Sequence, residues 1–467
     1  MAKAKTDMTR GAILPVLVRF SLPIMLTSII GQLFNTADTV VVGRWGGATE
    51  AAREIALSAV GSCGPLNGLL VTLFMGFSVG AGVLVSHAVG AREYDRIGRI
   101  VHTAVATAAL CGVVLGVLGF IFARPLLLLI GTPDAVIDEA VRYMRAYFCG
   151  VPAMMIYNYC ASMLRSTGDS TRPLFFLTVS GTANVALNLV MVIGFSQGAL
   201  GVGVATAASQ WLSCAMVLIY MSRDNGLCHF SFCQLGIHWE TLRRIVVIGL
   251  PAGIQSSMFA IGNVVMQSAL NSFNNTALVS GNAIASNLGA YSRTFCDAMT
   301  AAANVYVGQN TGAKNHARIR EGVRRTAITV TVASILTNAL LNLCSAPIVA
   351  LFAPGNAEIM HFARIKLVVS SSFYFFSHLA DVYAGSTRGM GRSTLPMLVS
   401  VGGNCGVRIL WIYTVFAWVH EPLVIFFAHG VSWFVTFVAQ LVIYHRTVRR
   451  VGLRWEQEKN DAVAASA

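Results

Sequence analysis

Long apolar stretches alternate with short polar ones along almost the whole chain of 467 residues. Each is long enough for an α-helix to cross a bilayer core about 30 Å thick, which takes about 20 residues. The Gly and Pro residues inside several of them are tolerated in membrane helices. The pattern predicts twelve transmembrane helices, over residues 20–42, 57–86, 100–123, 143–164, 174–195, 199–221, 245–270, 278–308, 326–346, 364–386, 394–418 and 422–444.

Composition supports an integral membrane protein surrounded by lipid. Hydrophobic residues make up 55% of the chain and charged residues 11%, whereas soluble domains carry about 25% charged residues. The net charge of +13 comes from basic residues in short loops between apolar stretches, so we expect no nucleic-acid partner. The ten cysteines lie apart and match neither a disulfide framework nor a zinc site.

The distribution of basic residues predicts the orientation of the chain. With twelve spans, both termini lie on the same side of the membrane. The loops and tails on that side hold 24 Lys and Arg residues, the loops and span ends on the other side hold 7, and Arg293 and Arg408 fall well inside spans. By the positive-inside rule, both termini are expected in the cytoplasm, with the chain in a plasma membrane.

Two motifs occur twice. LRSTGDSTRPL at 164–174 resembles TRGMGRSTLPM at 387–397, and VSHAVGAREYDRI at 85–97 resembles VGQNTGAKNHARI at 307–319. Six predicted spans separate the copies, and because six is even, the two halves share one orientation. The pattern predicts an all-α polytopic membrane protein with two parallel-repeat six-helix bundles. We place the bundles at 1–222 and 241–467, the latter with a cytoplasmic tail, and a cytoplasmic linker at 223–240.

Two bundles around a cleft are typical of a secondary transporter that works by alternating access. The sequence contains no P-loop, so an ion gradient is the expected energy source. A membrane enzyme would need acids or histidines at one depth, whereas His87, His378 and His429 lie on three separate spans. We therefore predict that the chain is not an enzyme, and without a sizeable extramembrane domain we expect no obligate protein partner.

Three acidic residues lie well inside predicted spans, where ionisable groups are costly and often functional. Asp297 follows Arg293 by four residues, so the two are expected to pair on one helix face. Asp381 follows His378 by three residues and could pair with Arg408 of the next span. That second candidate site is equally consistent with a structural pair.

Asp38 has no basic residue one turn away on its predicted helix. A carboxyl group in apolar surroundings favours its protonated form and can take up and release a proton. We predict a cation-coupling site at Asp38, with a buried, hydrogen-bonded acid as the alternative. Asn184 and Asn188 share one face of the fifth span, and Thr206 lies on the sixth. The amides could face Asp38, although Asn also simply joins membrane helices.

Together, LFNTADTVVVGRWGG at 33–47, the parallel repeat, GFSVGAGVLVSHAVGAREYDRIGR, LRSTGDSTRP and STRGMGRSTLP resemble the bacterial multidrug (DinF-like) branch of the multidrug and toxic compound extrusion (MATE) family. The resemblance covers roughly residues 15–445. It implies a twelve-helix antiporter that exports small organic, often cationic or amphipathic compounds in exchange for protons or sodium ions.

The resemblance also assigns residues. Asp38 falls on the cation-binding aspartate of the first helix, and Asn184 and Thr206 match positions on the fifth and sixth helices. Asn188 stands where family members often have a second acid, and this favours a proton over sodium. The glutamate that sodium-coupled members carry on the seventh helix is absent from this span, which offers Gln255, Asn263 and Gln267.

The substrate is the least defined part of the prediction. Phe34 and Tyr291 are aromatic residues that could line the cleft and attract organic cations, together with the three amides of the seventh span. The alternative function is a flippase for lipid-linked precursors, which would need a strongly basic cavity, yet Arg293 and Arg408 are the basic residues within spans. We expect no metal and no cofactor beyond the transported H⁺ or Na⁺.

Overall fold

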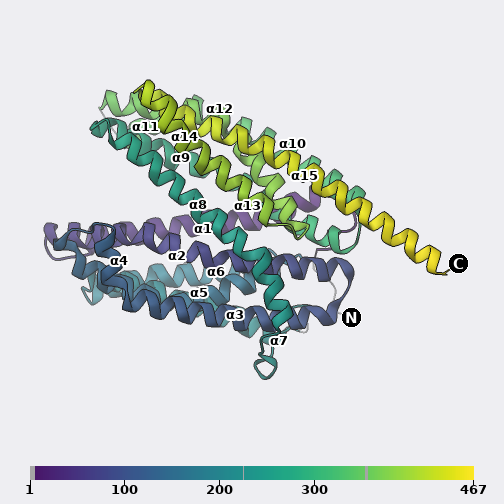
Figure 1. Ribbon diagram of the computed structural model, residues 1–467. Helices are drawn as coiled ribbons and strands as arrows, with labels where there is room; N and C mark the ends of the chain where they lie inside the picture. The colour runs from purple at the N-terminus through teal and green to yellow at the C-terminus, as the bar shows by residue number, and fades with distance from the viewer. Residues whose placement is uncertain (1–5, 225, 353–355, 467) are drawn as a thin grey trace. The chain divides into compact units, whose positions relative to one another are not determined.

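The computed structural model of the protein describes residues 6–224, 226–352 and 356–466. Every regular element among these residues is helical (Figure 1). The predicted bundles and linker also include residues 1–5, 225, 353–355 and 467, which lie outside the described residues. Within the described ranges the helices form twelve rods, one for each predicted span. Two short helices, α4 (Ala123–Leu129) and α11 (Ser345–Phe352), follow the third and ninth rods, and the 3₁₀-helix η2 (Phe232–Gln234) lies between α7 and α8.

The six rods of the first half are α1 (Ile13–Trp45), α2 (Glu50–Ala91), α3 (Tyr94–Ile121), α5 (Asp134–Ser166), α6 (Thr171–Leu189) continued by the π-helix η1 (Val190–Gly194), and α7 (Gly198–Arg223). Those of the second half are α8 (Trp239–Asn271), α9 (Thr276–Gly312), α10 (His316–Leu343), α12 (Ala357–Gly389), the rod of α13 (Thr394–Val401), η3 (Gly402–Gly406), α14 (Val407–Trp411) and η4 (Ile412–Phe416), and α15 (Pro422–Ser466). Most rods extend beyond the predicted spans because polar residues continue the helices past the apolar core.

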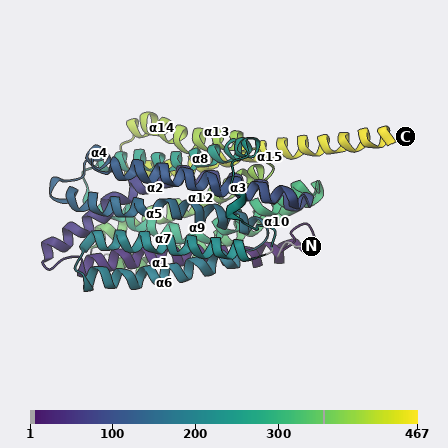
Figure 2. The ribbon, with the colours of Figure 1, turned by 90° about the horizontal axis from the view of Figure 1, so that it is seen from below.

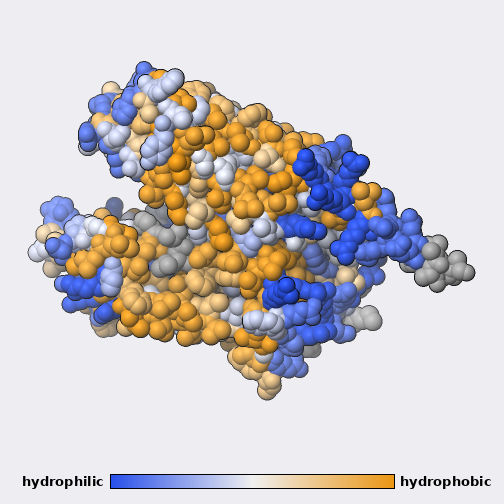
Figure 3. Space-filling view, viewed as in Figure 1, coloured by the Kyte–Doolittle hydropathy of each residue, from blue (hydrophilic) through white to orange (hydrophobic). Residues whose placement is uncertain are grey.

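Nine of the rods in the described part of the chain are long and apolar enough to cross a membrane by composition alone. The other three, α5, α9 and α12, contain no stretch of spanning length that is as apolar. Large exposed apolar side chains cover the flanks of the helices, and hydrophilic residues gather at the helix ends (Figure 3). This distribution suits helices that face lipid along their sides and water at their ends.

The chain divides into two compact units, the first mainly Leu26–Val89 and Glu93–Gly253, the second mainly Met8–Met25 and Ile254–Ala467. In the first unit, α5 packs against α3 and α7, and α6 runs beside α7 (Figure 2). In the second unit, α12 packs against α9, α10 and α15. The predicted boundaries of the bundles at 222 and 241 remain a prediction from the sequence.

The backbone of the two repeated motifs is alike in both copies. Gly168 and Gly391, at matching places in the first motif, have φ angles of +90° and +81°. Arg92 and Lys314, at matching places in the second, have φ angles of +60° and +53°. Glycine adopts this left-handed conformation at little cost, whereas other residues rarely do. The repeat seen in the sequence is therefore also a repeat of turn geometry.

Asparagine caps start three helices of the second unit. The side chains of Asn275, Asn315 and Asn356 each accept a hydrogen bond from the backbone N–H three residues later, at 2.9, 3.1 and 3.0 Å. These bonds satisfy N–H groups that the first turn of a helix leaves without partners. The start of α9, α10 and α12 is thus encoded locally, before any packing.

Candidate functional site

Asp38 lies on α1 and is half-buried in the first unit. The side-chain amide of Asn188, on α6, donates a hydrogen bond to the Asp38 carboxylate. Among the described residues, Asp38 forms no ion pair. The acid is therefore held by a neutral donor, and its charge is not neutralised by a fixed cation.

A chain of amides continues from Asp38 into the unit. The Asn188 amide group also donates to the Asn184 carbonyl oxygen at 3.3 Å, and the Asn184 amide group donates to the Thr206 hydroxyl of α7 at 3.5 Å. Asn184 and Asn188 are buried. The structure thus brings together all four residues of the predicted coupling site, and their helices α1, α6 and α7 meet here.

The buried Asn188 carbonyl oxygen has no hydrogen-bond partner within the described chain. It lies on the same side chain that binds Asp38, and leaving it unpaired costs free energy. Immediately after this residue, α6 widens into the π-helix η1, a local geometry that is frequent at functional sites. The Asp38 carboxylate and this oxygen could together accept a proton-bearing or cationic species.

Phe34 lies one turn before Asp38 on α1, and its ring packs directly on Gly181 of α6. A Cβ atom at Gly181 would lie 1.7 Å from Cε2 of the ring, so this position has no room for a side chain. The ring therefore joins α1 to α6 close to Asp38. The interpretation of Phe34 as a cleft residue stays a prediction, and its visible role is packing.

The second unit contains an arginine between two acids. The Arg293 guanidinium lies 3.2 Å from Asp381 of α12 and 3.6 Å from Asp297 of its own helix, α9. The expected neighbour Asp297 is thus present, but Asp381 is the closer partner. An arginine can join carboxylates on two helices because its guanidinium group offers several N–H donors.

The predicted pairing of Asp381 with Arg408 is wrong. The Arg408 guanidinium instead donates to Asn263 at 3.0 Å and to Ser432 at 3.1 Å, and no described acid contacts it. The His378 ring contacts the Ser334 hydroxyl at 3.0 Å. Asp381, His378 and Arg408 were grouped because of their places in the sequence. In the structure their side chains contact different helices, and Arg293 of α9 is the partner of Asp381.

Beside Arg293 the second unit contains a partly open cavity of about 370 Å³. Asn263 and Gln267 line it, whereas Gln255 and Tyr291 do not. The Gln255 carbonyl oxygen accepts a hydrogen bond from Arg388 at 2.8 Å, and Tyr291 is exposed. Of the seventh-span amides, the structure therefore places two at the cavity and one elsewhere.

Lys366 also lines this cavity and was missed in the sequence, where it was counted among the basic residues outside the membrane. The structure shows it 6% exposed on α12. Its ammonium group donates to the Asn282 carbonyl oxygen and to the Ser286 hydroxyl, the latter at 2.8 Å. One signal could have revealed it: Lys366, Ser370 and Tyr374 recur every four residues, which puts them on one helix face.

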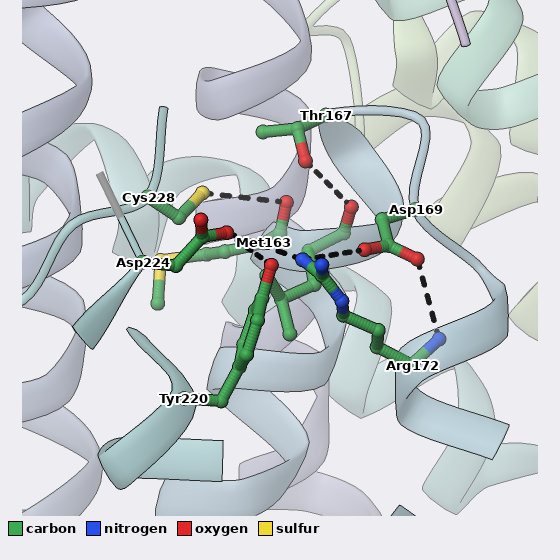
Figure 4. A network of polar contacts seen from close by, with 8 residues as sticks. Met163, Thr167, Asp169, Arg172, Tyr220, Asp224 and Cys228 are labelled. Atoms are coloured by element: carbon green, nitrogen blue, oxygen red, sulfur yellow. Dashed lines mark hydrogen bonds and ion pairs between the residues drawn. The ribbon is translucent and has the colours of Figure 1, made fainter. Parts of the chain in front are cut away.

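A polar cluster closes the end of the first unit where the linker begins (Figure 4). Arg172 contacts Asp224 at 3.1 Å and Asp169 at 3.4 Å, and the Tyr220 hydroxyl donates to Asp224. The Cys228 thiol, on the linker, points to the Met163 carbonyl oxygen at 3.8 Å. Burial raises the pKa of this thiol to about 12. The cluster ties the linker to its bundle, and its contacts are those of a structural anchor.

The described residues contain no group of three or more His, Cys, Asp or Glu side chains placed to hold a metal ion. The two sites are instead a single carboxylate with neutral amides in the first unit, and a basic cavity in the second.

Comparison with known proteins gives a consistent result. The sequence model of the family described as MatE matches residues 23–190 and 251–414, once in each half of the chain. The chain is 26% identical over 400 residues to the probable multidrug resistance protein YoeA of Bacillus subtilis, covering 84% of each protein. It is 21% identical over 388 residues to the probable multidrug resistance protein NorM of Thermotoga maritima, covering 82% of each.

Solved structures share the fold. A MATE crystal structure in the bent conformation superposes with a TM-score of 0.89 at 16% identity, over 97% of this chain and 99% of that chain. The Vibrio cholerae MATE transporter VcmN in the bent form gives a TM-score of 0.86 at 18% identity, over 96% and 99%. At this level of identity, the likeness concerns the fold.

Proposed function

Because the chain belongs to the MatE family of multidrug efflux transporters, we propose that it exports small organic compounds across a plasma membrane in exchange for protons that bind at Asp38. The observation that supports this most is the Asn188–Asp38 hydrogen bond. In this arrangement, a single carboxylate inside a predicted membrane span has a neutral hydrogen-bond partner.

Protonation of Asp38 would remove its charge and change its bond to Asn188. An ionised carboxylate accepts the amide hydrogen bond, whereas a protonated one can also donate. The Asn188 carbonyl oxygen, which has no described partner, is a ready acceptor for that proton. Proton uptake would thus shift hydrogen bonds between α1 and α6, and this difference would bias the first unit between two states.

A single carboxylate supports a proton more than a sodium ion. Sodium prefers several oxygen ligands with negative charge, and here Asn188 replaces a second acid. Sodium coupling through Asp38 and the amide oxygens is the alternative. The substrates we propose are cationic or amphipathic organic molecules. We also propose that the protein lies in a bacterial inner membrane with both termini in the cytoplasm.

The test is transport by the purified protein in liposomes. Vesicles with an acidic interior, or with high internal sodium, would be given a fluorescent organic cation outside, and uptake would be followed. We expect uptake driven by the pH gradient, and loss of that uptake in Asp38→Asn. Asp134→Asn, which changes an exposed acid at the start of α5, is the matched control. Normal proton-driven uptake in Asp38→Asn would refute the proposal.

A further inference from the structure

Three basic side chains line or flank the cavity in the second unit, and two of them, Lys366 and Arg408, are buried without an acidic partner among the described residues. Lys366 and Arg293 line it, and Arg408 lies behind two of its walls, with its guanidinium 5.5 Å from the Phe259 ring centre and 5.9 Å from that of Trp433. None of the described lining residues is acidic. A cavity of this kind would repel an organic cation.

The hydrogen bonds leave donors available. Lys366 donates to two neutral oxygens, from Asn282 and Ser286, so one of its three N–H groups is not used by these contacts. The Nη2 atom of Arg408 has no partner in the described chain, and Arg408 is 1% exposed. Because Lys366 lines the cavity, an acceptor bound there would satisfy its remaining N–H group.

The charges of this region do not balance. Arg293 is paired with Asp381 and Asp297, whereas Lys366 and Arg408 have neutral hydrogen-bond partners. Counted as ionised, these three basic and two acidic side chains leave one formal positive charge. An unpaired charge inside a membrane-spanning bundle is costly. A ligand with one negative charge would compensate for it.

Size and lining indicate what such a ligand looks like. A volume of about 370 Å³ suits a small organic group. Phe259, Tyr374 and Trp433 offer aromatic surface, and Asn263 and Gln267 offer amide groups. The lining residues come from the end of α8, the first halves of α9 and α12, and the start of α15, so the cavity lies in the half of the unit nearest to the α8–α9 turn.

We propose that this cavity is a binding site for the carboxylate of a small aromatic compound, with Lys366 as the residue that contacts the carboxylate. The role of the site in export rests on the proposed transport function, but its occupancy does not. The exported compounds would then include aromatic carboxylates and zwitterions.

The experiment is equilibrium dialysis of the full-length protein in detergent with 2-naphthoate, compared with 2-naphthylmethylammonium, which has the same ring system and the opposite charge. We expect the protein to bind 2-naphthoate and to bind the ammonium compound at least about tenfold more weakly. Charge-assisted hydrogen bonds have strengths that correspond to about ten- to a hundredfold in affinity.

Variants locate the site. Lys366→Met is expected to weaken 2-naphthoate binding about tenfold or more. Asn282→Asp keeps Lys366 but gives it a carboxylate partner within the protein. This carboxylate would compete with that of the ligand, so binding of 2-naphthoate should weaken similarly. Arg364→Met removes an exposed cation two residues away on α12 and should leave binding unchanged. Each variant is first checked for a single symmetric peak in gel filtration.

Equal binding of 2-naphthoate to wild type, Lys366→Met and Asn282→Asp would overturn the proposal, as would a preference for the ammonium compound. Asp38→Asn separates this proposal from the coupling mechanism. If Asp38→Asn binds 2-naphthoate normally but no longer transports, both proposals hold. If it transports normally and still loses binding when combined with Lys366→Met, the coupling proposal fails and the carboxylate site stands.

Discussion

The amide group of Asn188 on α6 donates a hydrogen bond to the carboxylate of Asp38 on α1. The two residues are 150 positions apart in the chain, and their contact joins two helices of the first unit. The same amide group donates to Asn184, and Asn184 donates to Thr206. Any change at Asn188 therefore acts on the acid and on the packing of α6 together.

A second carboxylate beside Asp38 should change the coupling ion. In Asn188→Asp, two carboxylates would occupy the place of one acid and one amide, and a pair of oxyanions favours a metal cation. We expect sodium-loaded vesicles to drive uptake by this variant more than choline-loaded ones. Asn188→Leu removes the bond without adding charge, so it should transport weakly with no response to sodium. A folded Asn188→Asp protein that ignores sodium would contradict the prediction.

Gly181→Ala should destabilise the first unit. The new Cβ would overlap the Phe34 ring. Overpacking of this kind lowers the free energy of unfolding by about 2 kcal/mol. The measurement is thermal unfolding in detergent. Gly194→Ala, where a Cβ would meet no atom within 4 Å, is the matched control. Phe34→Ala removes the obstructing ring, so the double variant should lose less stability than the two single changes add up to. Additive losses would show that the ring is not the cause.

Two substitutions in the cluster of Arg293, Asp297 and Asp381 should differ in their effect on stability. Asp297→Asn removes an ion pair whose carboxylate is 55% exposed, and such pairs contribute about 0–1 kcal/mol. Arg293→Met leaves Asp381 without its partner inside the unit, which costs about 3–5 kcal/mol for a buried pair and less here because the Asp381 side chain is 38% exposed. The unfolding temperature of Asp297→Asn should therefore be well above that of Arg293→Met. The reverse order would be evidence against the pairing of Arg293 with Asp381.

Two cysteines of the linker should react differently with maleimides. The Cys228 thiol is buried, and its pKa is raised to about 12, so little thiolate forms near neutral pH. Cys233 is exposed five residues later. In single-cysteine variants, a membrane-impermeant maleimide should label Cys233 rapidly and Cys228 slowly.

The same reagent tests the proposed orientation. With the linker in the cytoplasm, Cys233 should be labelled in inside-out vesicles and protected in intact cells. Labelling in intact cells would reverse the orientation. Slow labelling of Cys228 in both preparations is the internal control, and denaturation with detergent should expose it.

Much of the fold could be predicted because membrane helices have a simple local code. Apolar stretches of spanning length indicate twelve rods, and the paired motifs indicate the repeat, which the matching φ angles of Gly168 and Gly391 now show in the backbone. The short helices α4 and α11 were not predicted because they follow longer apolar stretches without a clear polar break. The sequence also singled out Asp38, Asn184, Asn188 and Thr206, since polar groups are rare in such spans.

Partner choice between distant helices is where sequence reasoning failed. Asp381 was expected to reach Arg408, and it contacts Arg293 instead. Lys366 looked like a loop cation and is a buried cavity residue. Local composition determined which residues lie in helices, because a bilayer penalises unpaired backbone and charge at every position. Which charges meet was decided only by tertiary packing, because the rotation of each helix and the residues it faces depend on contacts that no single segment contains.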